Sequence, residues 1–164
     1  MTSSDAEARI AAAIPPLDDR ARERAAAQDW DLGLLDPTDP DERAVPIRLA
    51  HPAFEDAIER GDDELIVDGR VMNPRLHLMI HEIVATQIID GDPRVRFETA
   101  ERLIAAGRDR HDVLHMLGST VSDQIWSASH DRRPYDRATH IAALAALPGS
   151  WDQLAQPAGD RPAR

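Results

Sequence analysis

The chain contains no cysteine and no lysine, and it has few aromatic residues. Without cysteine there is no disulfide framework, no thiolate zinc site and no thiol nucleophile, so any bound metal ion must take nitrogen or oxygen ligands. Aromatic residues make up 4% and hydrophobic residues 42% of the 164 residues. A chain of this length suffices for one domain, whose core we expect to consist of Leu, Ile, Val, Ala and Met side chains.

Positive charge is also scarce. The 19 basic residues are all Arg and stand against 30 acidic residues, which gives a formal net charge of −11. Nonspecific binding to nucleic acid needs clustered positive charge, so the composition predicts no nucleic-acid partner. An acidic cleft that attracts cations is compatible with this charge. A protein partner or a homo-oligomer is compatible with it too.

Long hydrophobic runs are missing as well. No apolar segment approaches the length that spans a bilayer, so we expect no membrane association. The N-terminal segment, MTSSDAEARI, lacks the positive and apolar regions of a signal peptide. The sequence therefore predicts a cytoplasmic protein.

The hydrophobic periodicity predicts an all-α fold, a small helical bundle with short loops. Helices are expected over residues 4–13, 18–28, 52–60, 73–89, 93–106, 110–128 and 138–147. Residues 36–46 contain three prolines and several acidic residues, which indicates a linker or an extended wrap. Residues 64–72 form either a minor β-hairpin that turns at Asp68–Gly69 or an extended loop.

These elements divide the chain into three regions. Residues 1–46 are predicted to form an N-terminal helical and extended arm. Residues 47–149 are predicted to form a His-rich helical core domain. Residues 150–164 are expected to form a flexible tail.

The helix over 73–89 carries the first chemically informative pattern. Asn73 is a suitable N-cap residue and Pro74 a suitable first residue of this helix. His77 and His81 then fall on one stripe with Val84 and Ile88, the stripe expected to face the core. Two imidazoles therefore stand where leucine would pack better.

The helix over 110–128 repeats the pattern with His111 and His115, at the edge of its apolar face and beside Gly118. Residues four apart on a helix lie about 5–6 Å from one another, so both imidazoles of a pair can reach one ion. We expect the two helices to pack antiparallel and to bring His77, His81, His111 and His115 around a transition metal. Zinc, iron, manganese and copper all accept nitrogen and oxygen ligands, so the pattern leaves the ion open.

Two carboxylates accompany these pairs, Glu82 after His81 and Asp112 after His111. The segment HDVLH resembles the zincin motif with Asp in place of Glu, the residue that activates metal-bound water. If three histidines bind the ion and one position stays open, Glu82 is the preferred general base and Asp112 the second candidate. If all four bind, the site is structural.

The other histidines and the large aromatic residues receive no functional role. His51 precedes Pro52 and is expected to end or cap a helix. His130 lies in a polar turn, and His140 stands alone in an alanine-rich helix. Core anchors are expected at three aromatic positions, Trp30, Trp126 and Tyr135.

Several of these segments together resemble a bacterial family catalogued as domain of unknown function eighteen forty-one. They are LAHPAF (49–54), NPRLHLMIH (73–81), DRHDVLH (109–115), and IW (125–126) followed by PYD. The resemblance covers roughly Ile47 to Leu147, and it implies that the four histidines belong to a shared pattern. Family members carry alanine where Asp112 stands, which counts against Asp112 as a base. The family has no assigned activity to carry over.

Two functions are compatible with these observations. The first is a metal-binding helical protein whose buried site is built from two H-x3-H helices and serves a metal-dependent hydrolase or oxidoreductase. The second is a non-enzymatic structural or interaction domain whose histidines form a hydrogen-bond network in the core. Metal content would distinguish the two.

Overall fold

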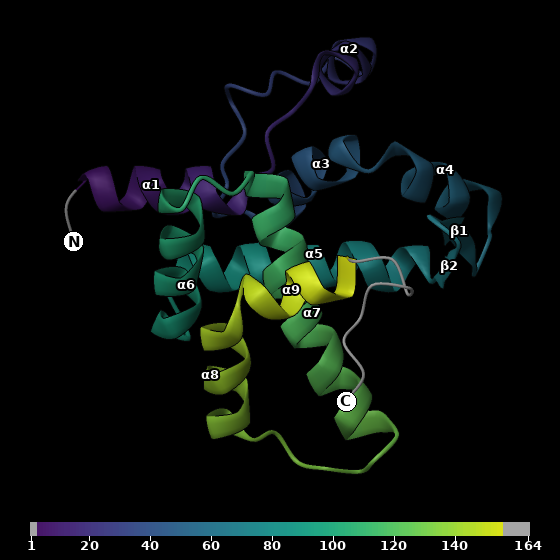
Figure 1. The fold of residues 1–164 in the computed structure, drawn as a ribbon. Coiled ribbons are helices and arrows are strands. Elements are labelled where there is room, and N and C mark those ends of the chain that lie inside the picture. The colour runs from purple at the N-terminus through teal and green to yellow at the C-terminus, as the bar shows by residue number, and fades with distance from the viewer. Residues whose placement is uncertain (1–2, 156–164) are drawn as a thin grey trace.

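A computed structural model describes residues 3–155 and is mostly helical (Figure 1). Its elements are, in chain order, α1 (Ser3–Ala13), α2 (Asp19–Ala27), α3 (Pro40–Ala50), α4 (Pro52–Arg60), β1 (Leu65–Val67), β2 (Arg70–Met72), α5 (Pro74–Asp90), α6 (Arg94–Ala105), α7 (Arg110–Ser129), α8 (Arg137–Ala146) and α9 (Gly149–Ala155). The predicted all-α fold with one minor hairpin is confirmed.

Local capping explains where the central helices begin and end. The side chain of Asn73 caps α5, with Pro74 as its first residue, and α5 ends at Gly91, whose φ of 66° is left-handed. Asp109 caps α7 and Asp136 caps α8 through their carboxylates. The helices expected over 73–89 and 110–128 are confirmed, and Asn73 caps the first of them as predicted.

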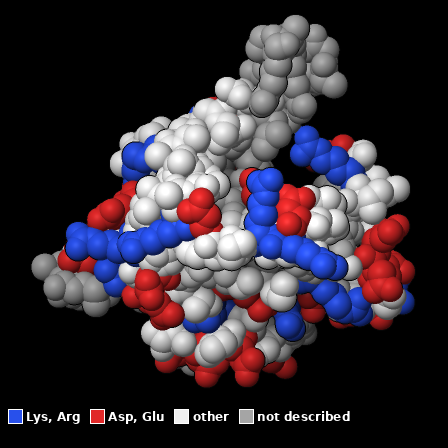
Figure 2. All heavy atoms as spheres, turned by 90° about the horizontal axis from the view of Figure 1, so that it is seen from below, with Lys and Arg blue, Asp and Glu red and all other residues white. Residues whose placement is uncertain are grey.

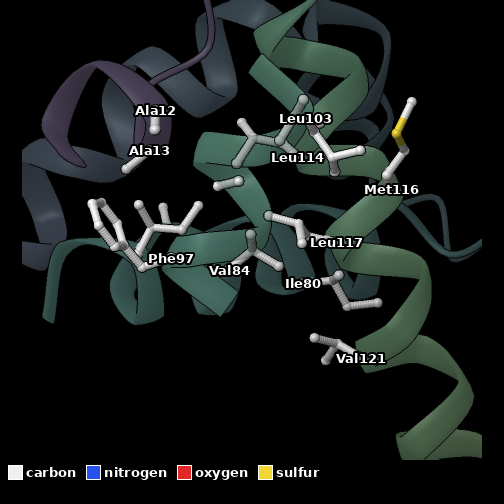
Figure 3. Close-up of a cluster of buried hydrophobic side chains, with 14 of the residues drawn as sticks. Ala12, Ala13, Ile80, Val84, Phe97, Leu103, Leu114, Met116, Leu117 and Val121 are labelled. Carbon is white, nitrogen blue, oxygen red and sulfur yellow. The ribbon is translucent and has the colours of Figure 1, made fainter. Parts of the chain in front are cut away.

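Helix α7 crosses α5 at the centre of the molecule (Figure 1). Both histidine pairs lie in the N-terminal halves of their helices. Figure 1 shows α7 crossing over α5 and not running alongside it, so the expected antiparallel packing was wrong. Gly118 permits the close approach, because a Cβ built there would lie 3.0 Å from Cγ2 of Ile80. Buried aliphatic side chains such as Leu114 and Leu117 fill the core around this crossing (Figure 3).

Helix α3 occupies much of the segment expected to be a linker or an extended wrap, and that prediction was wrong from Pro40 onward. Asp39 caps the helix by accepting from the backbone N–H groups of Asp41 and Glu42, and Pro40 stands at its start, where a missing N–H is tolerated. Ile47 on this helix is fully buried. The prolines therefore begin a helix that packs against α5.

The two short strands form an antiparallel hairpin in which Ile66 pairs with Val71. Its turn residues, Asp68 and Gly69, have φ values of 50° and 75°. Positive φ at both positions is typical of a type I′ turn, as the sequence predicts.

The predicted division into arm, core domain and tail stays a prediction. Helix α1 packs against α5 and contributes Ala12 and Ala13 to the buried core. Helix α9 lies within the region expected to be a tail, and residues 156–164 lie outside the described residues.

Three aromatic residues expected in the core are exposed instead. Trp30 is 42% exposed, and Trp126 and Tyr135 are each 60% exposed. Trp126 stacks on the ring of His130 at 3.5 Å between centroids. The core therefore consists mainly of aliphatic side chains, with Phe54 and Phe97 as its buried aromatic residues among those described.

The surface mixes charges of both signs. Figure 2 shows arginine and carboxylate side chains lying side by side on the face seen from below. Across residues 3–155, no helix combines the length and apolar character needed to cross a bilayer.

Candidate metal centre

Five histidines from three separate segments meet beside the crossing of α5 and α7. His77 and His81 come from α5, and His111 and His115 come from α7. The fifth is His51, which joins α3 to α4. The helical periodicity turns each pair toward the same point, and the crossing brings the pairs together.

Four of the five rings form the tightest group. One nitrogen from each of His51, His77, His81 and His115 lies within 4.8 Å of the other three. The ring centroids of His51 and His81 are 4.5 Å apart, and those of His81 and His115 are 4.7 Å apart. Nitrogens on opposite sides of one ion are separated by about 4 Å, so the group is close to the size that one ion requires.

His111 lies at the edge of this group. Its Nε2 is 2.8 Å from Nε2 of His51, and its ring centroid is 4.6 Å from that of His115. The structure therefore places all four sequence-predicted histidines in one cluster, with His111 in direct contact with the unpredicted His51.

The backbone fixes which nitrogen His51 presents to the cluster. His51 Nδ1 lies 2.7 Å from the carbonyl oxygen of Ile47, one helical turn earlier. A carbonyl can only accept, so Nδ1 carries the proton and the lone pair of Nε2 faces His111. Metal-binding histidines commonly donate their second N–H to a backbone carbonyl in this way.

Among the partners that residues 3–155 offer, none lies within hydrogen-bond distance of two buried nitrogens of the cluster, Nε2 of His77 and Nδ1 of His81. His81 is 1% exposed. A buried polar atom without a partner costs about 1–3 kcal/mol, so such atoms call for an explanation. A metal ion is one partner that a buried neutral imidazole nitrogen can bind.

Aromatic rings border the cluster on two sides. Phe54 of α4 stacks on His77 with 4.1 Å between centroids. Trp151 of α9 lies nearly parallel to His115 at 6.3 Å. Helix α9 is held there by Arg108, which donates two hydrogen bonds to the carboxylate of Asp152. These neighbours restrict water around the rings.

Burial keeps the imidazoles neutral. It lowers the pKa of His51 and of His77 from 6.5 to about 4. It lowers the pKa of His115 to about 3, with repulsion from neighbouring rings adding to the effect. The pKa of His81 is strongly lowered by the same causes, and burial also lowers the pKa of His111. Neutral imidazole is the form that binds metal ions.

The two carboxylates predicted as bases lie outside the group of converging nitrogens. Glu82 is half-buried, and Asp112 is exposed. Asp112 does act on the cluster at a distance, because its charge, together with that of Asp109, opposes the lowering of the His111 pKa. The catalytic roles of Glu82 and Asp112 stay predictions.

His51 is the residue that sequence reasoning missed. The structure confirms that it ends α3 and precedes α4, and its ring is nevertheless 5% exposed and central to the cluster. A lone histidine before a proline carries no periodic signal. Its place in the segment LAHPAF, which is part of the resemblance described above, is the signal that could have identified it.

Comparison with known families supports the resemblance. The family model described as Domain of unknown function (DUF1841) matches residues 34–146. The chain belongs to this family. The part that matches DUF1841 begins before α3 and contains all five clustered histidines. Searches of curated proteins and of solved structures gave no match.

Proposed function

We propose that this protein binds a transition-metal ion through His51, His77, His81 and His115. The observation that carries the proposal is the convergence of four neutral, largely buried imidazoles, each with a nitrogen within 4.8 Å of the others. Such a donor set suits zinc, iron, copper or nickel better than magnesium or calcium, which prefer oxygen.

The alternative is a purely structural hydrogen-bond network. It accounts for the contacts of His51 with Ile47 and with His111. It leaves the buried nitrogens of His77 and His81 without partners, which a network built for stability would avoid. A bound ion supplies a partner of the kind that these nitrogens lack, so metal binding is favoured.

Metal content tests the proposal directly. Protein purified without an affinity tag is dialysed against zinc, iron(II), manganese or copper(II), and bound metal is measured by inductively coupled plasma mass spectrometry. We expect about one ion per chain, and a loss of affinity of about tenfold or more in His77→Ala and in His81→Ala. Bound metal should also raise the melting temperature of the wild type.

His130→Ala is the matched control, because His130 is exposed and stacks on Trp126 away from the cluster. It should leave metal content unchanged. Circular dichroism establishes that each variant is folded. Wild-type protein that takes up none of these ions, or cluster variants that bind as well as the wild type, would refute the proposal.

A further inference from the structure

His111 is the fifth histidine of the cluster. It lies outside the group of four proposed ligands, so its role is not yet assigned. It stands near the N-terminus of α7, where Asp109 accepts a hydrogen bond from its backbone N–H at 2.8 Å. Its ring is half-buried, like those of His77 and His115, whereas His51 and His81 are buried. It can therefore reorient more easily than His51 or His81.

The contact between His111 and His51 constrains where the protons are. Because Nδ1 of His51 donates to Ile47, Nε2 of His51 must accept, and Nε2 of His111 must donate across the 2.8 Å contact. An ion that binds His51 through Nε2 takes the lone pair that accepts this hydrogen bond. Nε2 of His111 then lies beside the ion with no acceptor.

The 2.8 Å contact places a fifth imidazole nitrogen beside a proposed ligand atom, at a length typical of an N–H···N hydrogen bond. Two nitrogens bound to one ion at about 2.1 Å lie about 3.0 Å apart when they subtend a right angle and about 3.4 Å apart in a tetrahedron. Once the hydrogen bond is replaced, a small outward shift brings both Nε2 atoms to the spacing of two ligands. Five imidazole ligands require an ion whose coordination number is at least five.

We propose that His111 is a fifth ligand, and that it makes the site selective for ions of coordination number five or six, such as iron(II), cobalt(II) or nickel(II), over tetrahedral zinc. This inference rests on the proposed metal site. When the ion binds, the Nε2 proton of His111 shifts to Nδ1 of the same ring. The hydrogen bond between the two Nε2 atoms is then replaced by one bond from Nε2 of His51 and one from Nε2 of His111 to the metal. Five neutral donors then surround a doubly charged ion.

Differential metal affinity tests this assignment, with nickel(II) and zinc(II) as probes in isothermal titration calorimetry. In His111→Ala, nickel affinity should fall by about tenfold or more, since an imidazole ligand is lost. Zinc affinity should change by less than about threefold, since four ligands complete its shell. His130→Ala should alter neither affinity.

A second variant separates ligation from hydrogen bonding. In His111→Gln the side-chain amide can still donate to His51, so the metal-free packing is retained, but the imidazole ligand is gone. Nickel affinity should stay as low as in His111→Ala. Restoration of nickel affinity in His111→Gln would overturn the assignment, because His111 would then act through its hydrogen bond.

The outcomes also separate this inference from the proposed function. Equal loss of nickel and zinc affinity in both variants, or no loss of either, would overturn the role of His111 while leaving the metal site in place. A wild-type protein that binds neither probe would overturn both proposals.

Discussion

The buried arginine side chains of this protein, Arg43 and Arg96, donate to neutral acceptors. Arg96 is 1% exposed, and it donates to the carbonyl oxygen of Leu117 at 3.1 Å and to Nε2 of His140 at 2.9 Å. Within residues 3–155 it forms no ion pair. Burial lowers its pKa to about 10. A buried guanidinium in this setting depends on each of its acceptors.

His140→Ala should therefore destabilise the protein by about 1–3 kcal/mol, because one N–H group of Arg96 loses its acceptor in the core. His140→Gln, whose side-chain carbonyl can accept the same hydrogen bond, should lose less. Urea unfolding at pH 7, followed by circular dichroism, measures both. Equal stability of wild type and His140→Ala would contradict this account of Arg96.

The residues of the candidate metal centre differ in how far the sequence predicts them. His77 and His81, and likewise His111 and His115, are recognisable because helical spacing relates each pair. His51 is not, because its position is set by tertiary packing between α3 and α5, which no local pattern encodes. Asp112 has the spacing of a catalytic motif, yet its side chain is exposed.

Helix packing sets how closely the two histidine pairs approach. Gly118 of α7 lies against Ile80 of α5, and Ile80 is next to His81 in the chain. A side chain at position 118 would press on Cγ2 of Ile80, and a large one would push the two helices apart, since buried helix interfaces have little free space. The separation of the imidazoles is thus coupled to a contact made by residues that are not ligands.

Gly118→Val should destabilise the protein by about 1–3 kcal/mol through overpacking. It should also weaken metal binding, because the helices that carry the histidines are pushed apart. Thermal unfolding and metal titration measure the two effects. Ala128→Val, at an exposed site of the same helix, controls for the lower helix propensity of valine. A Gly118→Val protein that matches this control in both measurements would contradict the proposed coupling.

At the level of elements, capping residues predicted where several helices begin. The prolines of one helix, α3, were instead interpreted as a linker. Asn73, Asp109 and Asp136 each begin a helix where the sequence predicts one. Helix α3 was not predicted, because prolines at its start and interior resemble a linker. Its stability comes from the Asp39 cap and from the burial of Ile47, and the second of these depends on the rest of the fold.

Across the whole molecule, the buried imidazoles couple folding to pH. In the unfolded chain each histidine has a pKa near 6.5, whereas in the folded protein His51 and His77 have a pKa of about 4. Between these values the unfolded chain binds more protons, so the free energy of unfolding rises with pH. The stabilisation is complete above pH 6.5 and is lost as the pH falls toward 4.

The metal-free protein should consequently lose stability on acidification from pH 7 to pH 5. Each buried histidine adds a slope of up to about 1.4 kcal/mol per pH unit. Urea unfolding at several pH values measures the total slope. His81→Leu should reduce it, because one titrating group is removed, and His130→Ala should reduce it less, since His130 is exposed. A slope that His81→Leu leaves unchanged would count against the neutral cluster.

The proposed ligands come from distant parts of the chain, which has no cysteine and therefore no disulfide crosslink. His51 and His111 are 60 residues apart in sequence. An ion that binds His51, His111 and the histidines of α5 would tether α3, α5 and α7 in the manner of a reversible crosslink, since it can bind this set of ligands only when the chain is folded. In the presence of a chelator, proteases should then cleave the chain at a temperature well below the one at which they cleave the metal-bound protein.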